Sequence, residues 1–155
     1  MKLCLKYEPT PANARCFAAD IVAAATKANG ANLDYTIDSL RQVDAIIESF
    51  RSDGVTSDQV AETLFGFGCY VGEVIVRRGE GKWRAAVETP MAQFAGFPLV
   101  VQHGSDGYCN PIGKAFKLLE NGPEDSLWYF YQAIVAKAPG AKQEPNPRRP
   151  WWKFW

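Results

Sequence analysis

Apolar residues recur at helical spacing in five stretches of the chain, and this pattern predicts five helices. The first is predicted between the cap Thr10, which precedes a proline at the first helical position, and the left-handed stop at Gly30. The second is predicted between the cap Thr36 and Gly54. Its charged residues are expected to face away from the apolar stripe: Arg41, Asp44, Glu48 and Arg51.

The third predicted helix spans residues 57–78 and starts at the capping-box spacing of Thr56 and Gln59. Three glycines interrupt its apolar run: Gly66, Gly68 and Gly72. Each glycine costs a helix about 1 kcal/mol relative to alanine, so tight packing must offset that cost. Because Gly68 and Gly72 are four residues apart, they share a helix face that lets another element approach closely. No strand precedes them at the spacing of a phosphate-binding loop.

The last two predicted helices lie near the end of the chain. The fourth starts at Asn110, a cap followed by proline, and stops at residues 121–123. The fifth is expected to carry Glu124 and Asp125 in its first turn, where acids complement the helix dipole. It ends before residues 139–140, a Pro-Gly pair.

Three shorter segments have strand-like patterns. Lys2–Tyr7 alternates apolar and polar residues, and so does Lys82–Glu88, in which Trp83 lies on the apolar side. Phe97–His103 is a compact apolar run, predicted to be the antiparallel neighbour of Lys82–Glu88. The sequence therefore predicts an α+β fold, a small antiparallel sheet packed against about five helices in one domain over residues 1–140.

Residues 141–155 lack a periodic apolar pattern, and three prolines prevent a helix before Trp151. We interpret this segment as a flexible tail that starts with a semi-extended linker. The tail is basic although the whole chain has a net charge of zero. Because the net charge is zero, nucleic acid is an unlikely partner.

The composition also limits the function classes. The four cysteines form no CxxC pair and there is one histidine, so we expect neither a metal site nor a cofactor. No secretory signal and no apolar run long enough for a transmembrane helix is present. The expected location is cytoplasmic, with peripheral membrane contact as an option for the tail.

Polar residues within the third helix form the first candidate site. Glu73 lies in an apolar run, and Arg77 follows four residues later in the favourable order for an ion pair. Tyr70 belongs to the same stripe. We weigh three interpretations: a structural ion pair, a polar cluster that binds a ligand or partner, and acid–base catalysis by Glu73, which has no second group to share the work.

The turn after the second of these apolar strands forms a second candidate. His103 precedes the turn that contains Asp106, and Cys109 follows six residues after the histidine. A thiol–imidazole nucleophile is conceivable, but a solvated loop histidine is the simpler interpretation. We therefore predict no catalytic residue, and we name Trp83, His103 and Asp106 as parts of a binding surface that includes residues 83–106.

The tail carries the third candidate, an alternation of cations and aromatic rings: Arg148, Arg149, Trp151, Trp152 and Trp155. Tryptophan and arginine favour an anionic membrane interface and also dominate hot spots of protein interfaces. The tail could equally fold back on the apolar surface of its own domain. The four cations of the whole tail, Lys142, Arg148, Arg149 and Lys153, make a thin footprint for nucleic acid.

Two motifs carry a resemblance to a known family. The first is a Gly-x-Tyr-x-Gly-Glu helix within residues 68–78 that precedes a strand containing Trp83. The second is an Asn-Pro-x-x-Lys helix start at residues 110–117, followed by a Glu-Asn-Gly turn within residues 120–127. Residues 33–137 thereby resemble a family of small bacterial domains of unknown function. The resemblance implies an α+β architecture and a bacterial origin; some similar domains are candidate immunity proteins found beside secreted toxins.

Together these observations predict a non-enzymatic binding protein whose partner is another protein, such as a toxin that it inhibits. Two alternatives remain open from the residues. One is a peripheral membrane protein held by the Arg/Trp-rich tail, and the other is a small enzyme that uses Glu73 or the pair His103 and Cys109.

Overall fold

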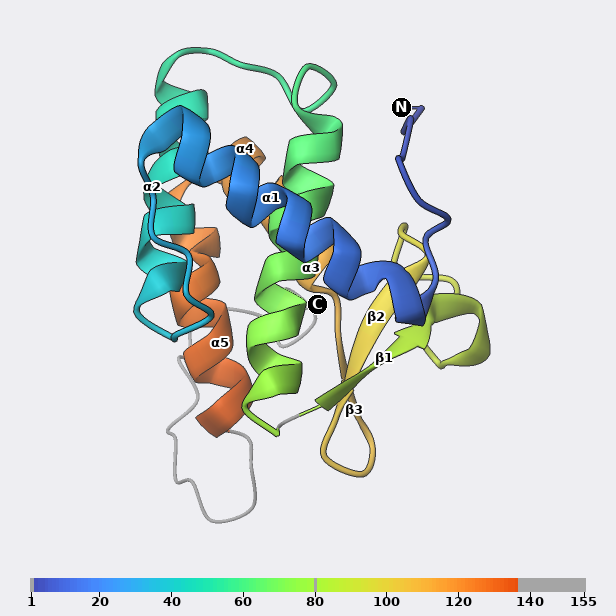
Figure 1. Cartoon of the computed structure of the whole chain (residues 1–155). Helices are drawn as coiled ribbons and strands as arrows, with labels where there is room; N and C mark the ends of the chain where they lie inside the picture. The colour runs from blue at the N-terminus through green and yellow to red at the C-terminus, as the bar shows by residue number, and fades with distance from the viewer. Residues whose placement is uncertain (1, 80, 137–155) are drawn as a thin grey trace.

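The computed structural model describes residues 2–79 and 81–136, which form five α-helices and one three-stranded antiparallel sheet (Figure 1). This confirms the predicted α+β class. The α-helices are α1 (Ala14–Asn29), α2 (Ser39–Ser52), α3 (Ala61–Arg77), α4 (Pro111–Asn121) and α5 (Leu127–Ala136). The strands are β1 (Gly81–Ala85), β2 (Leu99–His103) and β3 (Gly107–Cys109). Three short 3₁₀ turns are η1 (Pro11–Asn13), η2 (Ala86–Glu88) and η3 (Pro123–Asp125).

Helix α3 lies at the centre of the molecule. Its residues from Leu64 to Ile75 are buried without interruption, which is what a helix that is apolar on all sides requires. Helix α1 crosses α3, α4 packs along it, and the sheet contacts its C-terminal half (Figure 1). Helices α2 and α5 pack against each other and complete the helical layer.

The sheet has the order β1-β2-β3, and each pair of neighbouring strands is antiparallel. The register places Trp83 opposite Val101 and Val101 opposite Cys109, so these side chains share the face that packs on the main core. On the other face, Val100 packs with residues of the connection between β1 and β2 in a second, smaller core: Ala86, Met91 and Ala95. The irregular connection thus covers the sheet.

Strand β3 was not predicted, because its three residues are too short to show an alternating pattern. The sequence indicated only a turn after His103. That turn exists and joins β2 to β3 as a tight hairpin, in which His103 is paired with Gly107.

The N-terminal strand prediction was wrong. The segment Lys2–Tyr7 is extended, and Leu3, Leu5 and Tyr7 are half-buried against the core while their neighbours are exposed. The alternation is therefore real, but the segment joins no sheet. Instead, the Cys4 N–H donates to the Glu62 carboxylate at 2.9 Å.

Helix boundaries differ from the predicted ones at four starts. After the Thr10 cap the chain forms the turn η1, and α1 begins only at Ala14. Thr36 accepts from the Ser39 N–H at 3.3 Å, but α2 proper begins only at Ser39. The Gln59 side chain accepts from the Thr56 N–H at 2.9 Å, so half of the capping box forms, yet α3 begins at Ala61. The acids predicted for the first turn of α5 lie in η3 instead.

Asp125 has a different role from the predicted one. Its carboxylate is buried and pairs with the Lys114 ammonium of α4 at 2.6 Å, and it also accepts from the Asn121 amide at 2.9 Å. The start and end of α4 follow the prediction, since the Asn110 side chain accepts from the Gly113 N–H at 2.9 Å. Asn110 therefore caps this helix, and Lys114 fixes it to η3.

Asp44 does not face solvent, contrary to the sequence-based expectation. It is half-buried on α2 and accepts from the Ser126 hydroxyl at 2.6 Å and from the Leu127 N–H at 2.7 Å. Burial raises the pKa of the Asp44 carboxyl, while the hydrogen bonds from Ser126 and from the α5 backbone lower it. A residue of α2 thus caps α5, which explains an acid on the inner side of α2.

Candidate functional site

The glycine face of α3 admits two neighbours. A Cβ at Gly68 would collide with the backbone of Ile112 in α4, and a Cβ at Gly72 would collide with the Trp83 indole of β1. The close approach predicted from the spacing is therefore present, with a different element at each glycine. Gly66 faces α1 more loosely, because a Cβ there would lie 3.1 Å from the Ile21 Cβ.

Glu73 sits next to the indole that Gly72 admits. The carboxylate is buried, with 7% of the residue exposed. One oxygen accepts from the Trp83 indole N–H at 2.9 Å, and the other accepts from the Arg77 guanidinium Nε–H at 3.1 Å. The ion pair with Arg77 was predicted, whereas the bond from Trp83 was not. The sequence did contain a signal for this bond: an acid next to a glycine in an apolar helix, ten residues before a tryptophan in a predicted strand.

Arg77 carries this arrangement to the surface, where about half of its side chain is exposed. Its guanidinium lies over the Tyr35 ring, 3.5 Å from the ring centroid, which is a cation–π contact. The Tyr35 ring in turn packs on Tyr70 with 4.9 Å between centroids. Sequence reasoning missed Tyr35 because it lies in a loop 42 residues before Arg77, where spacing along a helix gives no information.

The backbone of Tyr35 is strained. It has φ of 61°, and no other non-glycine residue of the described ranges has a positive φ. The Tyr35 N–H donates to the Tyr70 hydroxyl at 2.8 Å, and this hydroxyl also shares a hydrogen bond of 2.6 Å with Ser39. Tyr70 is fully buried, so it supports Tyr35 from beneath and does not reach solvent itself.

The electrostatics of the cluster follow from burial. Burial raises the pKa of the Tyr70 hydroxyl, against the hydrogen bonds with Ser39 and with the Tyr35 backbone. Burial also raises the pKa of Tyr35, and Arg77 opposes this. Both phenols are therefore neutral at pH 7. We call Arg77 and Tyr35, with the neighbouring Asp34 and Arg78, the Arg77–Tyr35 surface. Within it, hydrogen bonds from Thr36 lower the pKa of Asp34, and Arg78 makes a smaller contribution.

The other predicted site residues are not brought to the Arg77–Tyr35 surface as a group. Trp83 is buried beneath it, and Asp106 is exposed in the turn between β2 and β3. His103 lies at the end of β2, where its imidazole packs against Gly107. Cys109 is 2% exposed and lies on the same sheet face as His103, two positions along the ladder. The Cys109 thiol, which would be the nucleophile if these two residues formed an active site, therefore lies inside the core.

Within the predicted surface 83–106, the connection between β1 and β2 exposes two large apolar side chains. Val87 is 80% exposed and Phe94 is 79% exposed. The second core holds the connection beneath them.

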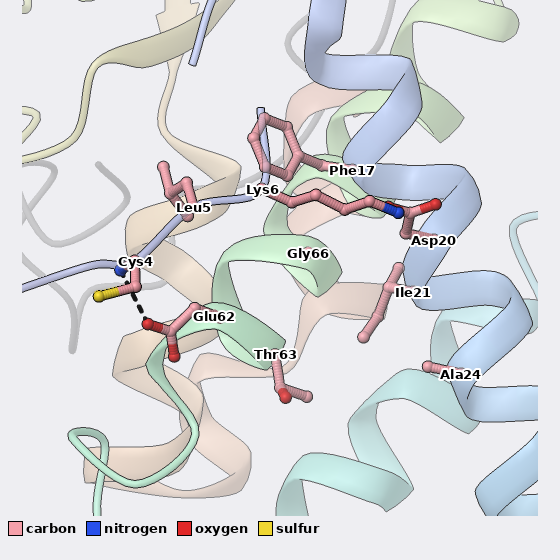
Figure 2. A pocket seen from close by; sticks show the side chains of 10 residues that line it. All are labelled: Cys4, Leu5, Lys6, Phe17, Asp20, Ile21, Ala24, Glu62, Thr63 and Gly66. Atoms are coloured by element: carbon pink, nitrogen blue, oxygen red, sulfur yellow. Dashed lines mark hydrogen bonds and ion pairs between the residues drawn. The ribbon is translucent and has the colours of Figure 1, made fainter. Parts of the chain in front are cut away.

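A pocket of about 240 Å³ opens at the other end of α3 (Figure 2). It lies between the N-terminal segment, α1 and the first turns of α3. Ten residues line it: Cys4, Leu5, Lys6, Phe17, Asp20, Ile21, Ala24, Glu62, Thr63 and Gly66. The sequence did not indicate this site, because its residues come from three separate segments and none belongs to a recognisable motif.

The tail residues Arg148, Arg149, Trp151, Trp152 and Trp155 lie outside the described residues, as does the boundary predicted at residue 140. Among the described helices, none has both the length and the apolar character needed to cross a bilayer.

No protein-family model, no curated protein and no solved structure matches this chain. The resemblance to small bacterial domains therefore stays a prediction based on the two motifs.

Proposed function

We propose that this chain is a non-enzymatic binding protein that recognises a partner protein through the Arg77–Tyr35 surface. The observation that carries the proposal is the strained Tyr35, held between Tyr70 below and the Arg77 guanidinium above. A left-handed backbone at a residue with a side chain costs about 1–2 kcal/mol, and such strain concentrates at functional positions. Here the cost fixes a tyrosine ring under an exposed arginine.

The chemistry of this surface suits a protein partner. Tyrosine and arginine are enriched among residues that dominate binding energy at interfaces. Both side chains are held before any partner arrives, because Glu73 orients the guanidinium and Tyr70 supports the ring. Preorganised groups lose less conformational entropy on binding.

The partner class that we propose is a toxin-like protein inhibited by the chain. Support comes from the resemblance to candidate immunity proteins, one of whose two motifs is the helix that contains Tyr70, Glu73 and Arg77. An inhibitor needs a rigid surface and no reactive group. In this arrangement Glu73 forms an ion pair with Arg77 and accepts a hydrogen bond from Trp83, which suits a structural role for the carboxylate.

The test is capture of a partner by the tagged full chain from a lysate of the encoding organism, followed by affinity measurement with the purified partner. We expect Arg77→Ala to weaken the affinity by roughly 30-fold or more, as a hot-spot residue does. Arg15→Ala is the matched control, because Arg15 is exposed on α1 and does not belong to this surface. Equal affinity of Arg77→Ala and Arg15→Ala, with both variants folded, would contradict the proposal.

A second candidate function is association with an anionic membrane through the tail. The alternation of Arg148 and Arg149 with three tryptophans favours it. If it is right, removing residues 148–155 abolishes sedimentation with phosphatidylserine-containing vesicles and leaves the circular dichroism spectrum intact. Unchanged sedimentation after that truncation would eliminate this candidate.

A further inference from the structure

We propose that the pocket between the N-terminal segment, α1 and α3 binds an arginine or lysine side chain of the partner protein, together with a large apolar residue beside it. The inference rests on the proposed protein-binding function and assigns it a second contact. The Arg77–Tyr35 surface lies at the C-terminal end of α3, whereas this pocket lies at its N-terminal end. The two contacts can therefore be tested separately.

The inner wall of the pocket is apolar. Phe17 and Ile21 of α1 line one side, and Leu5 of the N-terminal segment lies opposite them (Figure 2). Gly66 adds no side chain to the floor of the pocket, where the Ile21 side chain packs close to the α3 backbone. An apolar side chain, or the methylene stem of a lysine or arginine, can fill such a pocket.

The rim of the pocket carries more negative than positive charge. The lining residues include two carboxylates, Asp20 and Glu62, and one ammonium, Lys6. The Cys4 N–H donates to the Glu62 carboxylate, and this hydrogen bond lowers the pKa of Glu62. Glu62 is therefore anionic at neutral pH, which complements a cationic ligand.

Lys6 marks the position that a partner's cation would take. Figure 2 shows its side chain reaching past Gly66 towards Asp20, and its ammonium lies 3.3 Å from the Asp20 carboxylate. Both side chains are largely in solvent, at 70% and 46% exposed. Exposed pairs of this kind contribute little to stability, so an incoming cation can replace Lys6 at Asp20 without disturbing the fold.

The wall that carries Lys6 belongs to no helix or strand of the described residues. The segment Lys2–Tyr7 has no strand partner and is held by side chains, including the Tyr7 hydroxyl, which donates to Asp20 at 2.8 Å. Asp20 and Glu62 therefore anchor the wall and remain at the rim of the pocket. A small shift of the segment would widen the mouth for a partner side chain.

The test uses N-acetyl-Phe-Arg-amide as the probe, with amide chemical shifts of the full chain as the readout. We expect saturable shifts at Ala24, Thr63 and Gly66. N-acetyl-Phe-Glu-amide should bind about tenfold more weakly, as the loss of one charge-assisted contact predicts. Absence of saturable shifts, or equal affinity for the two probes, would overturn the inference.

Two matched variants locate the contact. Ala24→Phe places a ring in the pocket from an exposed position of α1, and we expect it to abolish probe binding. Ala23→Phe adds the same ring at the neighbouring exposed position, which does not line the pocket, and it should bind like the wild type. Probe binding that survives Ala24→Phe would place the contact elsewhere and overturn the assignment.

The same variants separate this inference from the proposed function. If Ala24→Phe captures the partner as tightly as the wild type, the pocket assignment fails and the proposed function stands. If the probe binds in the pocket but no partner protein is captured, the proposed function fails. The assignment of the bound cation to a partner protein then fails as well.

Discussion

At the scale of single residues, the interior of this protein contains polar groups that satisfy one another. The Tyr70 hydroxyl is the clearest case, since it accepts from the strained Tyr35 backbone and forms a hydrogen bond with the Ser39 hydroxyl. A buried polar group that loses such partners costs about 1–3 kcal/mol. The hydroxyl thus links the core of α3 to the loop that presents the proposed binding surface.

The raised pKa of Tyr70 predicts a loss of stability in alkali. In the unfolded chain the phenol ionises around its ordinary pKa of 10.0, whereas in the folded protein it stays protonated at higher pH. The stabilisation is therefore complete below pH 10 and is lost as the pH rises above it. We expect Tyr70→Phe to lose less stability than the wild type between about pH 9 and pH 11, measured as the shift in the urea midpoint.

The same variant tests the hydrogen bonds at neutral pH. Tyr70→Phe should lower the free energy of unfolding by about 1–3 kcal/mol at pH 7, because the Tyr35 N–H loses its acceptor. Tyr129→Phe is the control, since Tyr129 is 46% exposed on α5. Identical alkaline behaviour of the wild type and Tyr70→Phe would show that the phenol does not titrate as its burial implies.

At the scale of elements, the contacts of α3 depend on where it lacks side chains. Gly68 lies against the backbone of Ile112, which cannot move without shifting α4. Gly66 lies against the Ile21 side chain at 3.1–3.4 Å, and a side chain can adjust by a few tenths of an ångström. Gly66 and Gly68 are only two residues apart, yet they differ in how well they tolerate an added methyl group.

This difference gives a matched pair of substitutions. Gly68→Ala should lower the free energy of unfolding by about 1–3 kcal/mol or more through overpacking, in spite of the gain in helix propensity. Gly66→Ala should change it by less than about 1 kcal/mol, because the propensity gain offsets the small clash. Chemical denaturation of both variants measures the two values. A Gly68→Ala protein as stable as the wild type would mean that α4 is not seated on α3 as described.

At the scale of the whole molecule, one side chain joins the two halves of the sequence. Asp44 of α2 accepts from Ser126 and Leu127, which are 82 and 83 residues further along. The first turn of α5 contains no acidic residue, and the carboxylate that caps this helix comes from α2. The packing of α2 on α5 is thereby fixed in orientation as well as in distance.

Asp44→Ala should lower the free energy of unfolding by about 1–2 kcal/mol, the usual effect of removing a helix cap. Asp44→Asn should retain part of this, because an amide oxygen still accepts. The exposed Asp53→Ala serves as the control. Thermal unfolding followed by circular dichroism measures the three variants, and equal midpoints for Asp44→Ala and Asp53→Ala would rule out the capping role.

Local signals predicted much of this fold. The cap at Asn110, the left-handed stop at Gly30 and the apolar stripe of α3 all depend on neighbours within a few residues, and the structure has each of them. The missed features depend on distant partners. The bond between Trp83 and Glu73 requires knowing which face of β1 meets α3, and the pocket combines residues from three segments.

The candidate site was predicted in part for the same reason. The pairing of Glu73 with Arg77 follows from helical spacing, so the sequence indicated it. Tyr35 and its positive φ depend on a tertiary hydrogen bond to Tyr70, and no pattern within the loop predicts it. The tail, which carries five of the predicted binding residues, lies outside the described residues.

The all-round apolar character of α3 has a consequence for synthesis of the protein. On the ribosome, α1 emerges before α3 and can cover one side of it, but α4 and the sheet that cover the remaining sides emerge later. A nascent chain in which α3 has left the ribosome but α4 has not therefore exposes a hydrophobic surface that chaperones can bind. Productive folding must wait until residue 121 has left the exit tunnel, and chains that stall before α4 should be cleared by proteolysis.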